Sequence, residues 1–378
     1  MRFIATADWQ LGMTAHFLDD EARPRFHQAR FDAVRRIGAL TKELDAQFVV
    51  VAGDVFESNQ LHRAVVSRTL EALSGYEVPV VLLPGNHDPL DAASIYDDPA
   101  FLDRVPEHVH VIREGGVHEL MPGVEIVGAP WFSKRPLGDL VAEACAELEP
   151  KSDGTVRVIL GHGAVSTLNP DREDPATIDV PAIQELLANG TVDAAILGDR
   201  HGTYEVAESI WYPGAPEVTH RREEDPGNVL LVDVSPEGTT FEKHAVGNWL
   251  FLTVEAYLGS EDDVAAFSDR LASLPNKERT ALWLALTGTL STRARAELDR
   301  ILDEHRDVFA RLDFWDRHTD LVTVANDSDF HDLGLSGFAA EALEELNEIA
   351  GSGSESATTA QDALALLYRF AAGEAAAK

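Results

Sequence analysis

The sequence predicts a layered α/β fold with central β-sheets flanked by helices, followed by a small βαβαβ domain and C-terminal helices. Three observations predict it. Short apolar runs alternate with amphipathic stretches up to about residue 245, the alternation restarts after Gly247, and a Gly/Ser-rich stretch separates two final amphipathic segments. We therefore expect one domain over residues 1–247, a second over 248–334 and a helix–linker–helix segment over 335–378.

The apolar runs of the first domain are continuous rather than alternating, which is typical of strands that are buried on both faces. The runs occupy residues 3–7, 48–52, 80–84, 124–128, 156–160, 194–197 and 229–234. Between the first two, apolar residues recur every three or four positions from Phe26 to Leu44 and predict a helix with one apolar face. A second helix is expected over residues 63–73.

The rest of the chain repeats the strand–helix pattern on a smaller scale. The expected order is a strand at 249–255, a helix at 263–274, a strand at 280–286, a helix at 293–310 and a strand at 320–324. Two amphipathic helices are expected over 338–350 and 359–372, separated by the Gly/Ser-rich stretch 351–356. Docking on another protein and packing against their own domain explain these two helices equally well.

Composition excludes several classes of protein. The single cysteine, Cys145, forms no intramolecular disulfide, so a reducing cytoplasm is the expected location. No apolar run reaches the length of a signal peptide or a membrane span, so we expect neither secretion nor a membrane protein. The net charge of −34 argues against tight, autonomous binding to nucleic acid, which depends on Lys and Arg.

Side chains that can coordinate a metal (Asp, Asn, Gln and His) follow five of the predicted strands. They are Asp8-Trp9-Gln10, Gly53-Asp54, Gly85-Asn86-His87-Asp88, Gly161-His162 and Gly198-Asp199-Arg200-His201. Each motif taken alone is explained by a turn, a core histidine or a surface ion pair. Because ligands of open α/β folds bind at the carboxyl ends of strands, all five together predict one site. Their carboxylate, amide and imidazole groups suit two divalent cations.

These motifs resemble those of the calcineurin-like metallophosphoesterases, normally Asp-x-His, Gly-Asp, Gly-Asn-His, Gly-His and Gly-His-x-His. The segments around Asp8 and Asp54, together with Tyr212-Pro213-Gly214-Ala215-Pro216, resemble more closely the bacterial SbcD-type DNA repair nuclease subunits within that family. The close similarity covers about 245 residues, and the rest of the chain shares only the layout of a capping domain and C-terminal partner-binding helices.

The resemblance implies a metallophosphoesterase fold and two metals bridged by Asp54. One metal would be completed by Asp8, Gln10 and His201, and the other by Asn86, His162 and Asp199. His87 is expected to face the scissile phosphate, where it stabilises charge or protonates the leaving oxygen. Two divalent cations about 3.5–4 Å apart would polarise the phosphate and acidify the attacking water.

Two positions depart from the family pattern, because Gln10 and Asp199 stand where histidine is usual. Both keep an oxygen that can coordinate, so the preferred metal is expected to move toward Mn2+, with Mg2+ as the second choice, and away from zinc. The alternative is a degenerate site that binds metal poorly and cuts slowly.

Three neighbouring residues have two interpretations each. Trp9 either stacks on substrate or packs in the core, Asp88 either orients His87 or caps the turn, and Arg200 either reaches a phosphate or lies on the surface.

The leading functional hypothesis is a manganese-dependent DNA exonuclease or endonuclease of DNA end processing and double-strand-break repair. By the resemblance, it would be the nuclease subunit of a complex with an SMC-like ATPase, held by the C-terminal helices, and a homodimer. Such a partner would offset the chain's acidity, because the ATPase clamps the DNA. Two alternatives remain open, a small-molecule phosphoesterase and a weakly active scaffold that regulates the ATPase.

Overall fold

The structure is a computed structural model, and it describes residues 1–169, 174–324, 335, 337–352 and 356–376. The chain divides into two compact units, Met1–Trp249 and Leu250–Lys378. The predicted boundary between the second domain and the C-terminal segment, at 334 and 335, borders residues outside the described set, and so does part of the predicted linker 351–356. The functional division into three parts stays a prediction.

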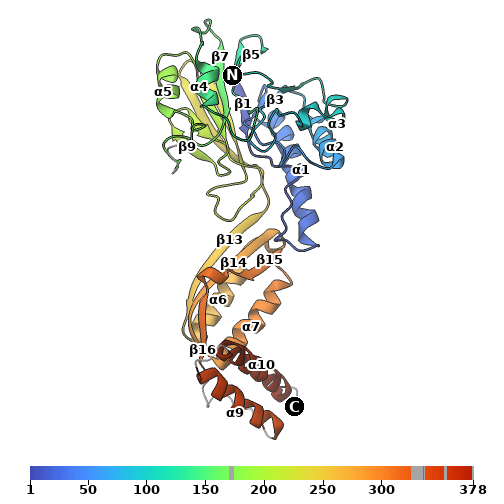
Figure 1. Cartoon of the computed structure of the whole chain (residues 1–378), viewed down its shortest axis with the longest axis vertical. Coiled ribbons are helices and arrows are strands. Elements are labelled where there is room, and N and C mark those ends of the chain that lie inside the picture. The colour runs from blue at the N-terminus through green and yellow to red at the C-terminus, as the bar shows by residue number, and fades with distance from the viewer. Residues whose placement is uncertain (170–173, 325–334, 336, 353–355, 377–378) are drawn as a thin grey trace. The chain divides into compact units, whose positions relative to one another are not determined.

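Two β-sheets form the centre of the first unit (Figure 1). One sheet runs in the order β12 (Gly238–Ala245), β11 (Asn228–Ser235), β1 (Arg2–Thr6), β2 (Val49–Val51), β3 (Val80–Leu82) and β4 (Val109–Val111). The other runs β5 (Gly116–Met121), β6 (Val124–Gly128), β7 (Val156–His162), β8 (Ala194–Gly198), β10 (Ile210–Tyr212) and β9 (Tyr204–Ala207). The strands β1 to β4 and β6 to β8 are parallel. Except for β4, which the sequence analysis did not predict, these strands fall within the continuous apolar runs, which are typical of parallel sheets.

Alternate side chains of these strands enter different layers of the core. Phe3 and Phe48 stack with ring centroids 4.7 Å apart, in a cluster that also holds Ile126 and Leu160 of the other sheet. Ile4, by contrast, packs with residues of two helices. Because successive strand residues point to opposite faces, this pattern shows that the sheets pack against each other and that helices cover their outer faces. The layered α/β prediction is confirmed.

The helices of the first unit lie on both sides of the paired sheets (Figure 1). They are α1 (Ala22–Glu43), α2 (Arg63–Leu73), the 3₁₀ turn η1 (Ile95–Asp97), α3 (Pro99–Leu102), α4 (Leu140–Cys145) and α5 (Val180–Ala188). Helices α1 and α2 pack on the β1–β3 side, and α4 and α5 pack on the β6–β8 side. Helix α2 has the predicted bounds, and α1 begins earlier than Phe26, where its apolar periodicity starts.

The second unit contains the predicted βαβαβ pattern with one additional strand. Its elements are β13 (Leu250–Leu258), α6 (Glu261–Ser273), η2 (Lys277–Arg279), β14 (Thr280–Ser291), α7 (Thr292–Arg306), β15 (Arg311–Phe314), η3 (Asp316–His318) and β16 (Asp320–Val324). The long strand β14 pairs in parallel with β15 near its start and with β16 near its end. The sequence missed β15 because helix α7 ends at Arg306, before the predicted end at 310.

Two C-terminal helices, α9 (Phe338–Gly351) and α10 (Ala357–Ala376), complete the second unit. Leu364 of α10 is fully buried, and Asp362 pairs with Arg295 of α7 at 3.5 Å, so α10 packs on its own unit. Helix α9 has no buried residue, and its Phe338 is 85% exposed. None of the helices formed by the described residues combines the length and apolar composition that crossing a membrane requires.

Candidate metal centre

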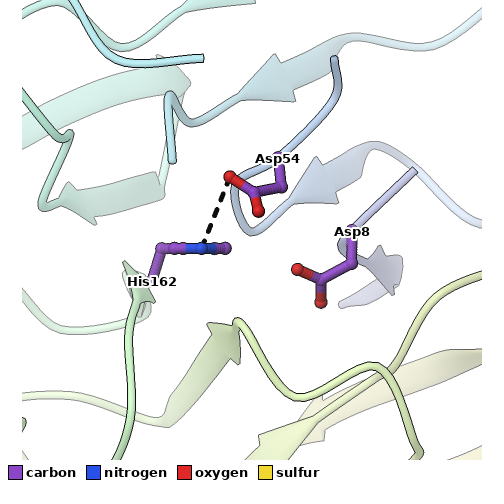
Figure 2. A group of neighbouring side chains, drawn as sticks. All are labelled: Asp8, Asp54 and His162. Atoms are coloured by element: carbon purple, nitrogen blue, oxygen red, sulfur yellow. Dashed lines mark ion pairs between the residues drawn. The ribbon is translucent and has the colours of Figure 1, made fainter. Parts of the chain in front are cut away.

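The candidate site lies at the carboxyl ends of strands from both sheets. Asp8 follows β1 and Asp54 follows β2 of one sheet, whereas His162 is the last residue of β7 in the other. Each offers one ligand atom, and these three atoms lie within 4.8 Å of one another (Figure 2). We call these three residues the ligand cluster. Within it, Asp54 Oδ1 and His162 Nε2 lie 3.5 Å apart.

Glycine is sterically required where the two sheets meet behind the ligand cluster. A Cβ atom on Gly53 would lie 2.1 Å from Nδ1 of His162, and one on Gly198 would lie 1.7 Å from the Ala52 carbonyl oxygen. Real Cβ atoms essentially never approach so closely. The glycines of the Gly-Asp motifs therefore let the two sheets bring their ligands together.

Four predicted ligands have backbone conformations that L-residues rarely adopt. The φ angles of Asp8, Gln10, Asp54 and Asp199 are 53°, 42°, 54° and 96°. Positive φ is uncommon for residues other than glycine, and its cost of about 1–3 kcal/mol each is met by surrounding structure. Such residues concentrate at functional sites, where the conformation aims a side chain. Here the four residues lie in three turns, after β1, β2 and β8, that lead into the same site.

His162 presents one nitrogen to the cluster. Its Nδ1 lies 2.9 Å from the Ala52 carbonyl oxygen, which can only accept, so Nδ1 carries a proton. Its Nε2 lies 2.7 Å from Oδ1 of Asn86. Burial alone would lower the pKa of His162, but the charges of Asp54, Asp8 and Asp199 outweigh it and raise this pKa to about 9. In the metal-free protein the ring therefore takes the place of a bound cation.

Asp8 is fully buried close to other carboxylates. Burial raises the pKa of Asp8 to about 7, and the charges of Asp54 and Asp199 contribute in the same direction. A buried group of carboxylates is unfavourable unless a cation neutralises it. Carboxylate and amide oxygens together with imidazole nitrogens also form the donor set of hard or borderline divalent ions. The residues present therefore fit the divalent metals that the sequence motifs implied.

The other predicted ligands lie beside Asp8. The backbone N–H of Asp199 donates to both carboxylate oxygens of Asp8, at 3.0 and 3.2 Å. His201 Nε2 lies 4.0 Å from Oδ1 of Asp8 and 3.2 Å from Nε2 of Gln10. Gln10 and His201 thus lie together on the Asp8 side, and Asn86 lies against His162. Asp199, which the resemblance groups with Asn86 and His162, contacts Asp8 through its backbone N–H. The assignment of individual metal ligands stays a prediction.

His87 is oriented by the Asp54 carboxylate and the Glu57 carbonyl group. Its N–H donates to Oδ1 of Asp54 at 3.0 Å, and its ring Nδ1 lies 2.9 Å from the Glu57 carbonyl oxygen. Because that oxygen only accepts, Nδ1 is protonated, and Nε2 is the nitrogen 4.0 Å from Oδ2 of Asp54. The side chain is 36% exposed. The side chain is thus half-buried, and its Nε2, beside the ligand cluster, is able to exchange a proton with a molecule bound there.

Asp88 and Trp9 have structural roles. Asp88 accepts hydrogen bonds from the Gly85 and Phe56 N–H groups and from the Tyr96 hydroxyl, at 2.8, 3.0 and 2.7 Å, so it caps the turn and does not orient His87. Burial raises its pKa to about 6. Trp9 is 1% exposed, and its indole N–H donates to Thr6. Of the two alternatives for Trp9, this contact pattern favours packing, because the core covers the ring.

Arg200 lies at the edge of the site. Its guanidinium sits over the Tyr204 ring, 4.6 Å from the centroid, and Nη2 is 3.4 Å from Glu224. The half-exposed side chain is thus held by a ring and a carboxylate on the surface. Its role toward a phosphate stays a prediction.

Two groups that the sequence motifs did not indicate support the site. Nδ1 of His201 lies 2.5 Å from Thr219 Oγ1 and 3.0 Å from Glu223 Oε1. Arg30 of α1 is buried, and its guanidinium donates to the Trp9 and Val218 carbonyl oxygens at 2.6 and 3.2 Å. Glu223 stands in a charged run typical of a surface loop, and Arg30 in a helix with several arginines, so no local signal distinguishes them.

Comparison with known proteins identifies the family. The sequence model of the family described as calcineurin-like phosphoesterase matches residues 1–232. A curated relative, the SbcD subunit of the nuclease SbcCD from Rhodobacter capsulatus, is 32% identical over 125 residues, which cover 32% of this chain and 26% of the relative. The match therefore spans about a quarter of that relative's length.

Two solved structures are similar over 65% of this chain. One is a protein of Thermus thermophilus, with 14% identity, 98% coverage of that protein and a TM-score of 0.41. The other is a dimetal phosphatase from Danio rerio, with 13% identity, 96% coverage and a TM-score of 0.40. The family match over residues 1–232 covers more than half of the chain, so the chain belongs to the calcineurin-like phosphoesterase family, whose members are metal-dependent hydrolases.

Proposed function

We propose that this chain is a manganese-dependent phosphodiesterase that cuts DNA as the nuclease subunit of a larger complex. DNA is proposed as the substrate because the chain is 32% identical, over 125 residues, to a protein named as a nuclease subunit. The ligand cluster of Asp8, Asp54 and His162 supports metal-dependent hydrolysis, since its atoms lie within 4.8 Å of one another. Exonuclease and endonuclease action in DNA end processing and double-strand-break repair is part of the same proposal.

In the proposed site, Asp54 would hold both cations. Asp8, Gln10 and His201 would complete one set of ligands, and Asn86, His162 and Asp199 would complete the other. When bound, the two cations supply positive charge beside the scissile phosphate and acidify the attacking water. The donor set is rich in oxygen, which supports Mn2+ and then Mg2+ over zinc.

His87 supplies the proton step of the proposed reaction. Its Nδ1–H is held by the Glu57 carbonyl, so Nε2 is the ring position that can carry a proton to the leaving oxygen. Transfer of this proton to the leaving oxygen leaves neutral imidazole, and the half-buried side chain recovers a proton from solvent.

The partner in the proposed complex is an SMC-like ATPase. A net charge of −34 makes unaided DNA binding weak, so a partner that holds the DNA would restore affinity, and a homodimer would add avidity. Phe338 of α9 and Phe370 of α10 are 85% and 68% exposed and offer apolar contacts to such a partner. A cytoplasmic location belongs to this proposal.

The test measures degradation of linear duplex DNA and of a chromogenic phosphodiester by the purified chain with Mn2+, alongside His87→Ala. We expect the variant to lose about 10²- to 10⁴-fold in both activities, the usual contribution of a general acid or base. His110→Ala is the matched control, because His110 is an exposed histidine on β4. Equal activity of wild type and His87→Ala would contradict the proposed role.

The acidic charge favours a second candidate, a small-molecule phosphoesterase with the same site. Rapid hydrolysis of mononucleotides with no cleavage of DNA, even after the ATPase is added, would select it. If neither substrate is cut while Mn2+ is bound, the scaffold alternative is selected instead.

A further inference from the structure

His201 has one ring nitrogen inside the candidate site and the other in a network of buried oxygens. Its Nδ1 lies 3.0 Å from Glu223 Oε1 and 2.5 Å from Thr219 Oγ1. The Thr219 hydroxyl donates to the same Glu223 oxygen, and the Thr219 backbone N–H donates to Glu223 Oε2 at 2.9 Å. Both carboxylate oxygens of Glu223 are therefore engaged.

The donors in this network determine where the proton of His201 resides. A carboxylate only accepts, and the hydroxyl proton of Thr219 is already directed to Glu223. Nδ1 of His201 must therefore carry a proton, which leaves the Nε2 lone pair of the neutral ring directed toward Gln10 and Asp8, at 3.2 and 4.0 Å. Nε2 is the nitrogen that a metal beside Asp8 would need.

The network is held by buried groups. The side chain of Glu223 is only 8% exposed. Arg30, itself buried, donates to the carbonyl of Val218, next to Thr219, and to that of Trp9, next to Asp8. This guanidinium thus fixes the Thr219 segment against the Asp8 segment, and its positive charge lies near enough to Glu223 to interact with it.

We propose that Glu223 is a positioning residue that fixes the tautomer and orientation of His201 and thereby strengthens metal binding on the Asp8 side. This inference rests on the proposed metal site. A carboxylate behind a ligating histidine orients the ring and makes its free nitrogen a stronger donor. The stronger donor matters more in this chain, because Gln10, an amide, stands where the family pattern has a second histidine. In the proposed site His201 is therefore the residue that supplies an imidazole nitrogen on the Asp8 side.

The test compares the affinity of the full-length protein for Mn2+ in wild type, Glu223→Gln and Glu224→Gln by isothermal titration calorimetry. Glu224 is the matched control, an adjacent glutamate whose side chain is 81% exposed. We expect Glu223→Gln to weaken the affected Mn2+ site by about 10- to 100-fold, the usual effect of removing a partner behind a ligand. Glu224→Gln should leave affinity within about twofold, since exposed charges contribute little.

A second measurement reports on His201 directly. In wild type loaded with diamagnetic Mg2+, ¹⁵N NMR should show His201 protonated at Nδ1, with that proton shifted downfield by its bond to the carboxylate. Glu223→Gln should lose the downfield shift, and Glu224→Gln should keep it. A purely structural role of Glu223 would not change this signal.

The outcomes separate this inference from the proposed function. Equal Mn2+ affinity of wild type and Glu223→Gln, or protonation of His201 at Nε2 in the Mg2+-loaded wild type, would overturn the role of Glu223 while leaving the metal site in place. Wild type that binds neither Mn2+ nor Mg2+ would overturn the metal site and this inference with it. If Glu223→Gln does not fold, the wild-type spectrum alone tests the inference, through the site of protonation on His201.

Discussion

Nε2 of His162 lies 3.5 Å from Oδ1 of Asp54, and the two residues come from strand ends of different sheets (Figure 2). His162 ends β7, and Asp54 follows β2. The site therefore spans the boundary between the sheets, and neither sheet alone contains it. Any substitution that separates the strand ends at this boundary should weaken metal binding without touching a ligand.

Asp54→Asn should weaken Mn2+ binding by more than about 100-fold, because the loss of a direct ligand should exceed the 10- to 100-fold cost of losing a group behind one. Phosphodiester hydrolysis should fall at least in parallel. Calorimetric titration with Mn2+ and a chromogenic diester measure both effects. Asp20→Asn is the control, since the Asp20 side chain is fully exposed. Unchanged Mn2+ affinity in Asp54→Asn would exclude the bridging role.

Gly53→Ala should lower the free energy of unfolding by about 2–4 kcal/mol, through an unfavourable φ and a steric clash. Gly53 has φ of +90°, and a Cβ there would lie 2.1 Å from His162 Nδ1. Gly190→Ala is the matched control, because Gly190 has φ of +75° but nothing within 4 Å of its Cβ position. It should cost only about 1–2 kcal/mol. Urea denaturation of both variants measures the difference, and equal losses would refute the clash.

The metal-free protein should lose stability as the pH rises from about 6.5 to 9. The pKa of folded His162, about 9, lies above its ordinary value of 6.5, so the folded state binds this proton more tightly than the unfolded state. The resulting stability is fully present below pH 6.5 and is lost as the pH rises through 9. Asp8, with its pKa raised from 3.8 to about 7, changes stability in the same direction at lower pH.

Mn2+ should reverse this loss, because the metal binds the deprotonated ligands. The rise in melting temperature on adding Mn2+ should therefore be larger at pH 8.5 than at pH 6, as measured by scanning fluorimetry. In His162→Gln the dependence of metal-free stability on pH between about 6.5 and 9 should become shallower. An unchanged slope in that variant would show that His162 is not the group responsible.

Phe338→Glu should weaken binding to the proposed SMC-like ATPase by about 10- to 100-fold, as expected for an exposed aromatic anchor of an interface. Phe338 is 85% exposed, so the melting temperature should not change. This variant is preferable to deleting the C-terminal segment, since Leu364 of α10 is buried and deletion would expose its neighbours. Tyr257→Glu is the control, with Tyr257 on β13 and 71% exposed. Undiminished binding, measured by surface plasmon resonance, would remove α9 from the proposed interface.

The sequence by itself predicted the layers and the central strands, because those strands are buried on both faces and are continuous apolar runs. It did not predict β4, β5, β9, β10 or β12, which lie at or near the edges of the sheets and have exposed or half-exposed residues. Strands β4 and β10 have only three residues each, and β5, β9 and β12 include charged residues, so periodicity distinguishes these strands poorly from loops. The predicted end of α7, at residue 310, was wrong. Apolar residues continue past Arg306 into a turn and β15, so the sequence pattern does not mark where the helix ends.

The sequence also determined which strand ends carry candidate metal ligands, because the Asp, Asn, Gln and His residues come directly after apolar runs. Only the tertiary structure decided how those side chains meet. It placed Asp54 against His162 across two sheets, covered the ring of Trp9 and directed Asp88 to the turn. It also placed Glu223 behind His201, 22 positions away in the chain. Such partners depend on packing between distant segments, which local sequence patterns do not encode.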